Sequence, residues 1–148
     1  MAYDPNLRRI ILFGGVNAFG TALNDTWFWT GTDWQLLSTA NSPGARYGHA
    51  MTTQGSSVYV SGGFRSLGYT DNDAWRFNGS NWSLYTASSA NPPSPRLDHG
   101  LAPQVGSGLL LHGGQTPAGL SGETFTGSSQ QGSSTPVRGH TLVYDPMS

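Results

Sequence analysis

Histidine side chains are the residues of this sequence whose spacing most directly suggests chemistry. His49, His99 and His140 occupy one position of a repeated pattern, and His112 lies apart from them beside a pair of glycines. Three histidines can bind zinc when their rings converge on one point. A repeat places equivalent residues in successive structural units, so these rings need not converge. We expect no metal site, a structural hydrogen-bonding role for the three repeated histidines, and no chemistry at His112.

Repeated carboxylates are the second candidate for chemistry. Asp25, Asp73 and Glu123 hold equivalent places, each close to an aromatic position. A repeated acid is typical of a turn or cap residue and not of a catalytic pair. The chain has no Cys, which excludes a thiol nucleophile and a Cys-ligated metal, and no G-x-S-x-G nucleophile elbow occurs. We predict no catalytic residue and no cofactor.

Paired glycines could suggest a phosphate cradle. However, the sequence contains neither G-x-x-x-x-G-K nor G-x-G-x-x-G, and no helix is expected to follow the pairs. We interpret them as backbone positions that need a positive φ or a close approach of another group. The pairs are Gly14 and Gly15, Gly62 and Gly63, and Gly113 and Gly114.

The composition indicates an all-β protein. Only 10% of the 148 residues are charged, while 21 are Gly and five are Trp. Glycine-rich turns that alternate with aromatic and β-branched runs are typical of short strands. The net charge of -1 shows no basic footprint for nucleic acid. The longest apolar runs, at 10–13 and 109–111, are far too short to cross a membrane. We therefore expect neither nucleic acid nor a membrane as a partner.

A repeat of about 50 residues organises the chain. The glycine pair at Gly14 returns at Gly62 and Gly113, and each pair ends an apolar run. Three further features recur in the same order. They are a first Trp (Trp27, Trp75), a second Trp (Trp34, Trp82), and an Arg three residues before a His (Arg46 and His49, Arg96 and His99).

Each period contains four predicted strands. Strand A follows the His (50–54 and 100–104), strand B ends at the glycine pair, strand C carries the first aromatic residue and strand D the second Trp. Short strands separated by Gly, Asn and Pro turns predict an antiparallel meander. One such sheet cannot bury both of its faces alone, whereas radial stacking of several sheets can.

The pattern resembles the kelch family of β-propellers over nearly the whole chain. The matching features are the glycine pairs, the strand-C aromatics Trp27, Trp75 and Phe125, the strand-D residues Trp34 and Trp82, and the Arg-x-x-His segments. The resemblance implies an all-β fold of about three four-stranded antiparallel blades in an incomplete ring. We place the blades at about 1–38, 48–86 and 98–135, with 139–145 as the first strand of a further blade.

The repeat departs from regularity at two places. The third repeat lacks a strand-D Trp, and residues 128–135 are predicted to form a loop where that strand should lie. Residues 1–5 align with 142–146, so the first strand A is expected to be truncated. The remaining blades or a second copy would then be needed to close the ring, and we favour a fragment of a longer propeller over a dimer.

Tryptophans at repeated positions could stack on sugars, but we interpret them as packing between sheets, which lie about 10 Å apart and need bulky side chains.

Strand alternation in such blades predicts that the B–C and D–A connections share one edge of the propeller. They are longer and more varied than the others, at 16–23, 64–71, 115–121, 39–45 and 87–95. Rigid scaffolds carry recognition on such loops. Phe19, Arg65 and Tyr69 are the candidate binding residues.

The sequence therefore predicts a non-enzymatic scaffold that binds a protein, or a glycan, through one loop edge. Two alternatives stay open. One is the propeller portion of a secreted enzyme similar to copper sugar oxidases, although those enzymes rely on a Tyr–Cys cross-link and this chain has no Cys. The other is a structural surface repeat protein.

Overall fold

Three four-stranded antiparallel sheets make up most of the protein. The computed structural model describes residues 1–85, 92–104, 106, 108–127 and 129–142, and these contain strands and no helix. The first sheet consists of β1 (Ala2–Asp4), β2 (Arg9–Val16), β3 (Ala22–Trp29) and β4 (Trp34–Leu36). The second sheet consists of β6 (Ala50–Gln54), β7 (Ser57–Ser61), β9 (Ala74–Phe77) and β10 (Trp82–Tyr85). The third sheet consists of β11 (Gly100–Pro103), β12 (Leu109–His112), β15 (Glu123–Thr126) and β16 (Ser129–Ser133).

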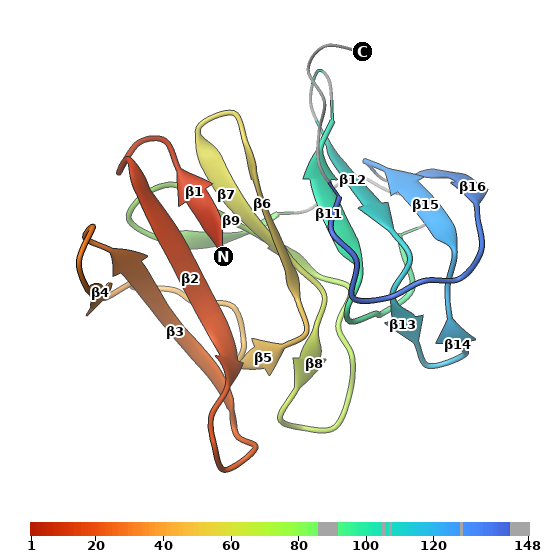
Figure 1. The fold of residues 1–148 in the computed structure, drawn as a ribbon, viewed down its shortest axis with the longest axis horizontal. Coiled ribbons are helices and arrows are strands. Elements are labelled where there is room, and N and C mark those ends of the chain that lie inside the picture. Colours follow the sequence, from red (N-terminus) through yellow and green to blue (C-terminus); the bar gives the residue numbers. More distant parts are fainter. Residues whose placement is uncertain (86–91, 105, 107, 128, 143–148) are drawn as a thin grey trace.

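Each sheet is a simple meander in which consecutive strands pair. The three sheets follow one another across the molecule in chain order, and β6 contacts both β1 and β11 (Figure 1). This is the arrangement of successive propeller blades, so the all-β prediction with four-stranded antiparallel units is confirmed. No helix among the described residues is long and apolar enough to pass through a membrane.

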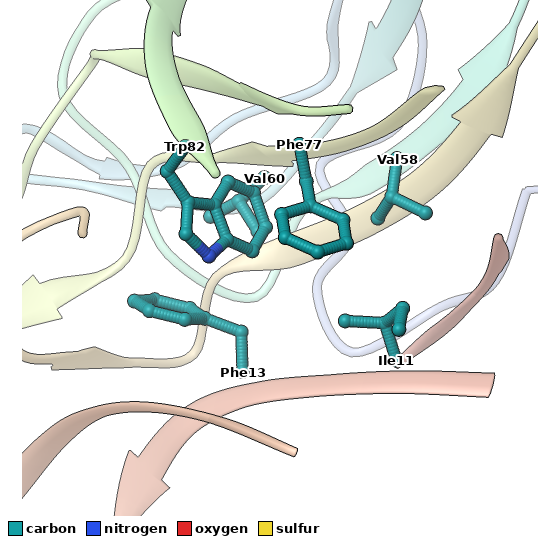
Figure 2. Packing of buried hydrophobic residues seen from close by; sticks show 6 residues of the cluster. All are labelled: Ile11, Phe13, Val58, Val60, Phe77 and Trp82. Carbon is teal, nitrogen blue, oxygen red and sulfur yellow. The ribbon is translucent and has the colours of Figure 1, made fainter. Parts of the chain in front are cut away.

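The first core lies between the first and second sheets. Ile11 and Phe13 of β2 point toward residues of β7, β9 and β10 (Figure 2). Trp82 is fully buried there, with its ring centroid 5.2 Å from that of Phe13 and 5.1 Å from that of Phe77. Its indole Nε1 donates a hydrogen bond of 2.9 Å to Thr26 Oγ1, so the one polar group of the ring is satisfied.

The second core lies between the second and third sheets. Its buried residues are Leu101, Leu109, Leu111 and Phe125. The second sheet contributes partly buried residues, among them Tyr59 and Tyr85, whose rings meet edge to face at 5.2 Å. Because side chains alternate across a strand, the second sheet can present Val58 and Val60 to one neighbour and Tyr59 to the other.

The outer face of the first sheet is not covered by any described strand. Ile11 and Phe13 face the second sheet, so Leu12 points the other way. Leu12 pairs with Trp27 on the adjacent strand, and these two residues and Trp34 line a shallow hollow of about 260 Å³. Trp34 is half-buried, whereas its repeat equivalent Trp82 is fully buried.

The prediction of a loop at 128–135 is wrong for residues 129–133. Residues Ser129–Ser133 form β16, which pairs with β15. Main-chain hydrogen bonds make this strand, and its Ser, Gln and Gly residues provide none of the hydrophobic alternation from which a strand is read. Residue 128 lies outside the described residues. Within the predicted further strand at 139–145, residues 139–142 form no strand and 143–145 lie outside the described residues.

Two of the predicted loops contain short strands. β8 (Phe64–Arg65) pairs with β5 (Arg46–Tyr47), and β13 (Gln115–Thr116) pairs with β14 (Gly119–Leu120). The B–C connections of the second and third sheets are therefore more ordered than the sequence indicated. Residues 87–91 of the predicted loop at 87–95 lie outside the described residues.

Candidate functional site

The connections that carry the candidate binding residues lie at one edge of the molecule. The β2–β3 connection, the short strands β5 and β8, and the β13–β14 hairpin all occupy the lower edge in Figure 1. Phe19 belongs to the first of these connections, and Arg65 and Tyr69 belong to the second. We call this the loop edge.

The glycine pairs of this edge are required by close contacts. Gly62 has φ +61°, and a Cβ there would lie 2.6 Å from Arg96 O and 2.8 Å from His99 Cε1. Gly63 has φ +99°, and a Cβ there would lie 2.9 Å from His49 Cβ. A glycine pair therefore fits between two Arg-x-x-His segments, its own and that of the next sheet. Gly113 and Gly114 meet their neighbours in the same way.

His49 and His99 pack against these glycines as neutral rings. Burial lowers the pKa of His49 to about 4 and that of His99 to about 3, and nearby Arg46 and Arg96 add to the effect. Neither ring nitrogen of His99 has a hydrogen-bond partner among the described residues. The expected hydrogen-bonding role is therefore wrong for His99, whose ring fills space between main chains. Buried polar groups without partners are rare and costly. The His99 ring therefore stabilises the fold through its shape and packing and not through hydrogen bonds.

No group of three His, Cys, Asp or Glu side chains within the described ranges is placed to hold a metal ion. His112, to which the sequence assigned no chemistry, has a hydrogen bond of 2.9 Å between Nδ1 and Thr124 Oγ1. Its ring lies 5.3 Å from the ring of His140. Both histidines thus take part in packing on the third sheet.

Two of the repeated carboxylates, Asp73 and Glu123, are ion-pair partners of the repeated arginines. Arg46 is fully buried, donates to Gly62 O at 2.9 Å and binds Asp73 with two nitrogens, one of them 2.9 Å from Oδ2. Arg96 donates to Gly113 O at 2.8 Å and to Glu123 Oε2 at 3.0 Å. The expectation of turn or cap residues is wrong at these acids, because the arginine lies far away in sequence and only folding brings the pair together.

Asp73 is strongly held in its ionised form. Burial opposes its ionisation, but the hydrogen bonds and charge of Arg46 and the indole hydrogen bond from Trp75 keep the pKa of Asp73 below its ordinary value. Arg65 also binds this carboxylate, with Nη2 3.0 Å from Oδ2, and forms an ion pair with Asp71. The guanidinium of Arg65 is thus committed to two carboxylates of its own chain.

The structure brings Arg65 and Tyr69 together but leaves Phe19 separate. Arg65 N donates to Tyr69 O at 2.9 Å, and Arg65 Cζ lies 5.8 Å from the centroid of the Tyr69 ring. Tyr69 stays 47% exposed. Phe19 is 93% exposed at the tip of the β2–β3 connection, where Asn17 Oδ1 accepts from Phe19 N at 2.9 Å and from Thr21 N at 3.0 Å. The loop edge therefore carries two exposed aromatic residues on ordered turns.

A groove of about 450 Å³ runs along the loop edge between the second and third sheets. Its lining comes from the β8 connection, the segment before β11 and the β13 strand. These residues are Phe64, Gly68, Tyr69, Thr70, Pro95, Leu97, Gln115, Thr116 and Pro117. Leu97 and Gln115, which both line the groove, exchange two main-chain hydrogen bonds of 3.0 and 2.8 Å.

Most groove residues were not identified as site residues from the sequence. The varied lengths of the connections at 64–71, 87–95 and 115–121 singled out the segments, and Tyr69 was chosen for its residue type. Pro95, Leu97 and Pro117 carry no signal of their own, because they come from separate segments that only the stacking of two sheets makes adjacent.

Comparison with protein families gives one finding. The family model described as the KLHDC2/KLHL20/DRC7 Kelch-repeats domain matches residues 1–144. No curated protein matches the chain at a significant level. The match spans all three sheets and the connections between them.

Proposed function

Since the chain belongs to the kelch-repeat family, we propose that it binds a protein partner at the groove of the loop edge. Kelch repeats form a propeller scaffold that is commonly used for protein binding. The assignment of partner binding to this groove rests on one observation. The exposed aromatic side chain of Tyr69 borders the groove, and main-chain hydrogen bonds hold the apolar lining in place.

The lining of the groove indicates the kind of partner. Phe64, Pro95 and Leu97 offer apolar surface, while Gln115 and Thr116 offer an amide and a hydroxyl. Such a mixture suits an extended peptide segment that inserts one apolar or aromatic side chain and forms hydrogen bonds beside it. A rigid groove lowers the entropy lost on binding, because few of its own side chains need to become ordered.

Phe19 provides a second point of contact. A phenylalanine that is 93% exposed on an ordered turn is an apolar side chain available to a partner that extends from the groove toward the first sheet. Tyrosine and other large aromatic residues are enriched among those that dominate binding energy. We therefore assign the main contact to Tyr69 and a supporting contact to Phe19.

A displayed peptide library selected on the purified chain tests this proposal. The Tyr69→Ala variant should weaken the selected binders by about thirtyfold, the change expected for a dominant interface residue. Phe19→Ala should weaken them less. Ser56→Ala is the matched control, because Ser56 is exposed at the β6–β7 turn on the opposite edge.

The proposal fails if the selected peptides bind the Tyr69→Ala and unaltered chains equally well, or if Ser56→Ala affects binding as much as Tyr69→Ala does. Stability of each variant is measured alongside, since Tyr69 is half-exposed and its loss should leave folding intact.

A further inference from the structure

The turn between β9 and β10, at residues 78–81, is organised around one side-chain oxygen. Asn78 Oδ1 accepts hydrogen bonds from Ser80 N at 3.1 Å, from Ser80 Oγ at 3.0 Å and from Asn81 N at 2.9 Å. Asn78 and Ser80 are both exposed. The amide of Asn78 is therefore open to water, while its carbonyl oxygen is held by three donors.

Gly79 gives this turn a main-chain nitrogen that is free to react. Its φ of +95° is one that residues with a side chain rarely adopt. Gly79 N donates to no residue that the structure describes, and neither does Asn78 Nδ2. The dipeptide Asn-Gly occurs only here in the sequence. The attacking nitrogen and the leaving nitrogen of an asparagine cyclisation are thus both unrestrained at this position.

The first sheet has the same turn without the amide. Thr30 Oγ1 accepts from Thr32 N at 3.3 Å and from Asp33 N at 3.0 Å. Gly31, the second residue of that turn, has φ +108°. Thr30 holds the repeat position of Asn78. Because a hydroxyl serves as the acceptor there, the turn itself does not require an asparagine.

We propose that Asn78 is a site of spontaneous deamidation. Gly79 N gives up its proton to water and forms a bond to Asn78 Cγ, the Cγ–Nδ2 bond breaks, and Nδ2 leaves as ammonia after taking a proton from water. The product is a cyclic succinimide. A water molecule then opens either of the two ring C–N bonds, which gives aspartate or isoaspartate. The reaction exchanges one amide for one carboxylate and consumes only water.

The three donors of the turn favour ring closure. Negative charge develops on Asn78 Oδ1 while Gly79 N attacks, and N–H and O–H groups already directed at that oxygen stabilise the charge. The turn also has room: a Cβ on Gly79 would come no closer than 3.7 Å to its nearest neighbour, Asn6 Cβ. None of the turn residues lines the groove of the loop edge, so this site does not depend on the proposed function.

The two products should affect the second sheet differently. Trp82 directly follows the turn and is fully buried. Aspartate at position 78 keeps an oxygen where Asn78 Oδ1 lies, so the hydrogen bonds from Ser80 and Asn81 can persist. In isoaspartate the main chain runs through Cγ, which lengthens the turn by one carbon atom and removes that acceptor. The isoaspartate form should therefore unfold at a lower urea concentration than the aspartate form.

Incubation of the folded chain at mildly alkaline pH, followed by peptide mapping, tests the site. Trypsin releases residues 77–96 as one peptide, which contains both Asn78 and Asn81. Mass spectrometry should locate the amide-to-acid mass increase at Asn78, and electron-transfer fragmentation distinguishes isoaspartate from aspartate. Asn81 is the internal control, because the bulky residue that follows it obstructs ring closure. Asn78 should react at least about tenfold faster than Asn81. A digest made before incubation gives the background.

Two variants separate the reactive amide from its surroundings. Asn78→Thr copies the turn of the first sheet, so it should abolish the reaction and leave the urea unfolding midpoint unchanged. Ser80→Ala removes one of the donors to Oδ1 and should slow the reaction about threefold. The effect is small because Ser80 is exposed and water can partly replace its hydroxyl.

Equal rates at Asn78 and Asn81 would overturn the proposal. So would an Asn78 that stays intact in the folded chain during a period in which the chain unfolded in urea reacts, since the turn would then protect the amide. An unchanged rate in Ser80→Ala would contradict the assistance by the donors. Identical unfolding curves of the separated aspartate and isoaspartate forms would contradict the effect on the segment that leads to Trp82.

Discussion

The two interfaces between sheets are built differently, although the same repeat generates both. The first interface contains the aromatic residues Phe13, Phe77 and Trp82, and its buried residues are 0–3% exposed. The second contains three leucines and Phe125, and its buried residues are 5–8% exposed. The first interface is therefore the more completely closed of the two.

Hairpin length explains this difference. In the β9–β10 hairpin, Trp75 pairs with Leu84, and two residues further on Phe77 pairs with Trp82. In the third sheet, Phe125 holds the place of Trp75, but the β15–β16 ladder already ends at the pair Thr126 with Ser129. The ladder position that carries Trp82 has no counterpart there. A shorter hairpin thus removes the large residue that fills the first interface.

Neighbouring sheets decide burial as much as sequence position does. Trp34 and Trp82 stand 48 residues apart at one repeat position. Trp82 is fully buried because the first sheet covers it, and Trp34 is half-buried because no described strand covers its face. The two tryptophans should therefore contribute different amounts to the free energy of unfolding, although they hold the same repeat position.

Substitution of these two tryptophans should give the largest contrast. Trp82→Ala should lower the free energy of unfolding by about 4 kcal/mol, because it leaves a cavity and an unpaired Thr26 hydroxyl. Trp34→Ala should cost about 1 kcal/mol, since much of its ring already contacts water. Urea unfolding followed by far-ultraviolet circular dichroism measures both. Equal losses would show that the outer face of the first sheet is covered in solution.

Loss of the buried arginine of the second sheet should lower the free energy of unfolding more than loss of the buried arginine of the third sheet. Arg46→Ala should cost about 3 kcal/mol, because it breaks a two-nitrogen ion pair with Asp73 inside the protein. Arg96→Ala should cost about 2 kcal/mol, since the side chain of Glu123 is 36% exposed and water can solvate it after the loss. Thermal unfolding of the variants ranks them, and a reversed order would contradict the assignment of the stronger pair to the second sheet.

Acid should weaken both interfaces through their histidines. Burial lowers the pKa of His49 to about 4 and of His99 to about 3 from 6.5, so the unfolded chain binds protons first. Their stabilising effect is fully present above the unfolded value and is lost as pH falls toward the folded values. At about pH 5 the loss is about 2 kcal/mol for each histidine.

Urea unfolding at neutral pH and at about pH 5 measures this loss, and His99→Gln should remove about half of it. His112→Gln is the comparison variant and should remove less of the loss than His99→Gln, because burial lowers the pKa of His112 as well but its side chain is only partly buried. Stability that is flat across this range would mean that the two buried rings can be protonated in place.

The smallest effect on stability is expected at the loop edge. Tyr69→Ala and Phe19→Ala should each change the free energy of unfolding by less than about 0.5 kcal/mol, because both rings are exposed. The same unfolding measurements test this. A loss comparable to that of Trp34→Ala would show that these aromatic residues serve the fold and not recognition.

The parts of the fold that carry a hydrophobic pattern could be predicted from the sequence, and the parts without one could not. The all-β class and the four-stranded units could be predicted, because glycine pairs, aromatic residues and apolar runs recur together along the chain. β16 could not, since Gln and Ser residues joined by main-chain hydrogen bonds leave no such pattern. The ion pair of Arg46 with Asp73 was also missed, because Asp73 was interpreted as a local turn or cap residue and Arg46 only as part of the repeated Arg-x-x-His segment.

The sequence by itself determined most of the local structure: the strands that carry apolar or aromatic residues, the turns between them, and the glycine pairs that adopt a positive φ. These follow from short-range sterics and from side-chain alternation, which depend only on neighbours in the chain. Only the tertiary structure decided which of two equivalent tryptophans is buried, which carboxylate receives an arginine, and that a groove forms between two sheets. Those outcomes depend on which sheet lies against which, and residues of distant segments make the contacts.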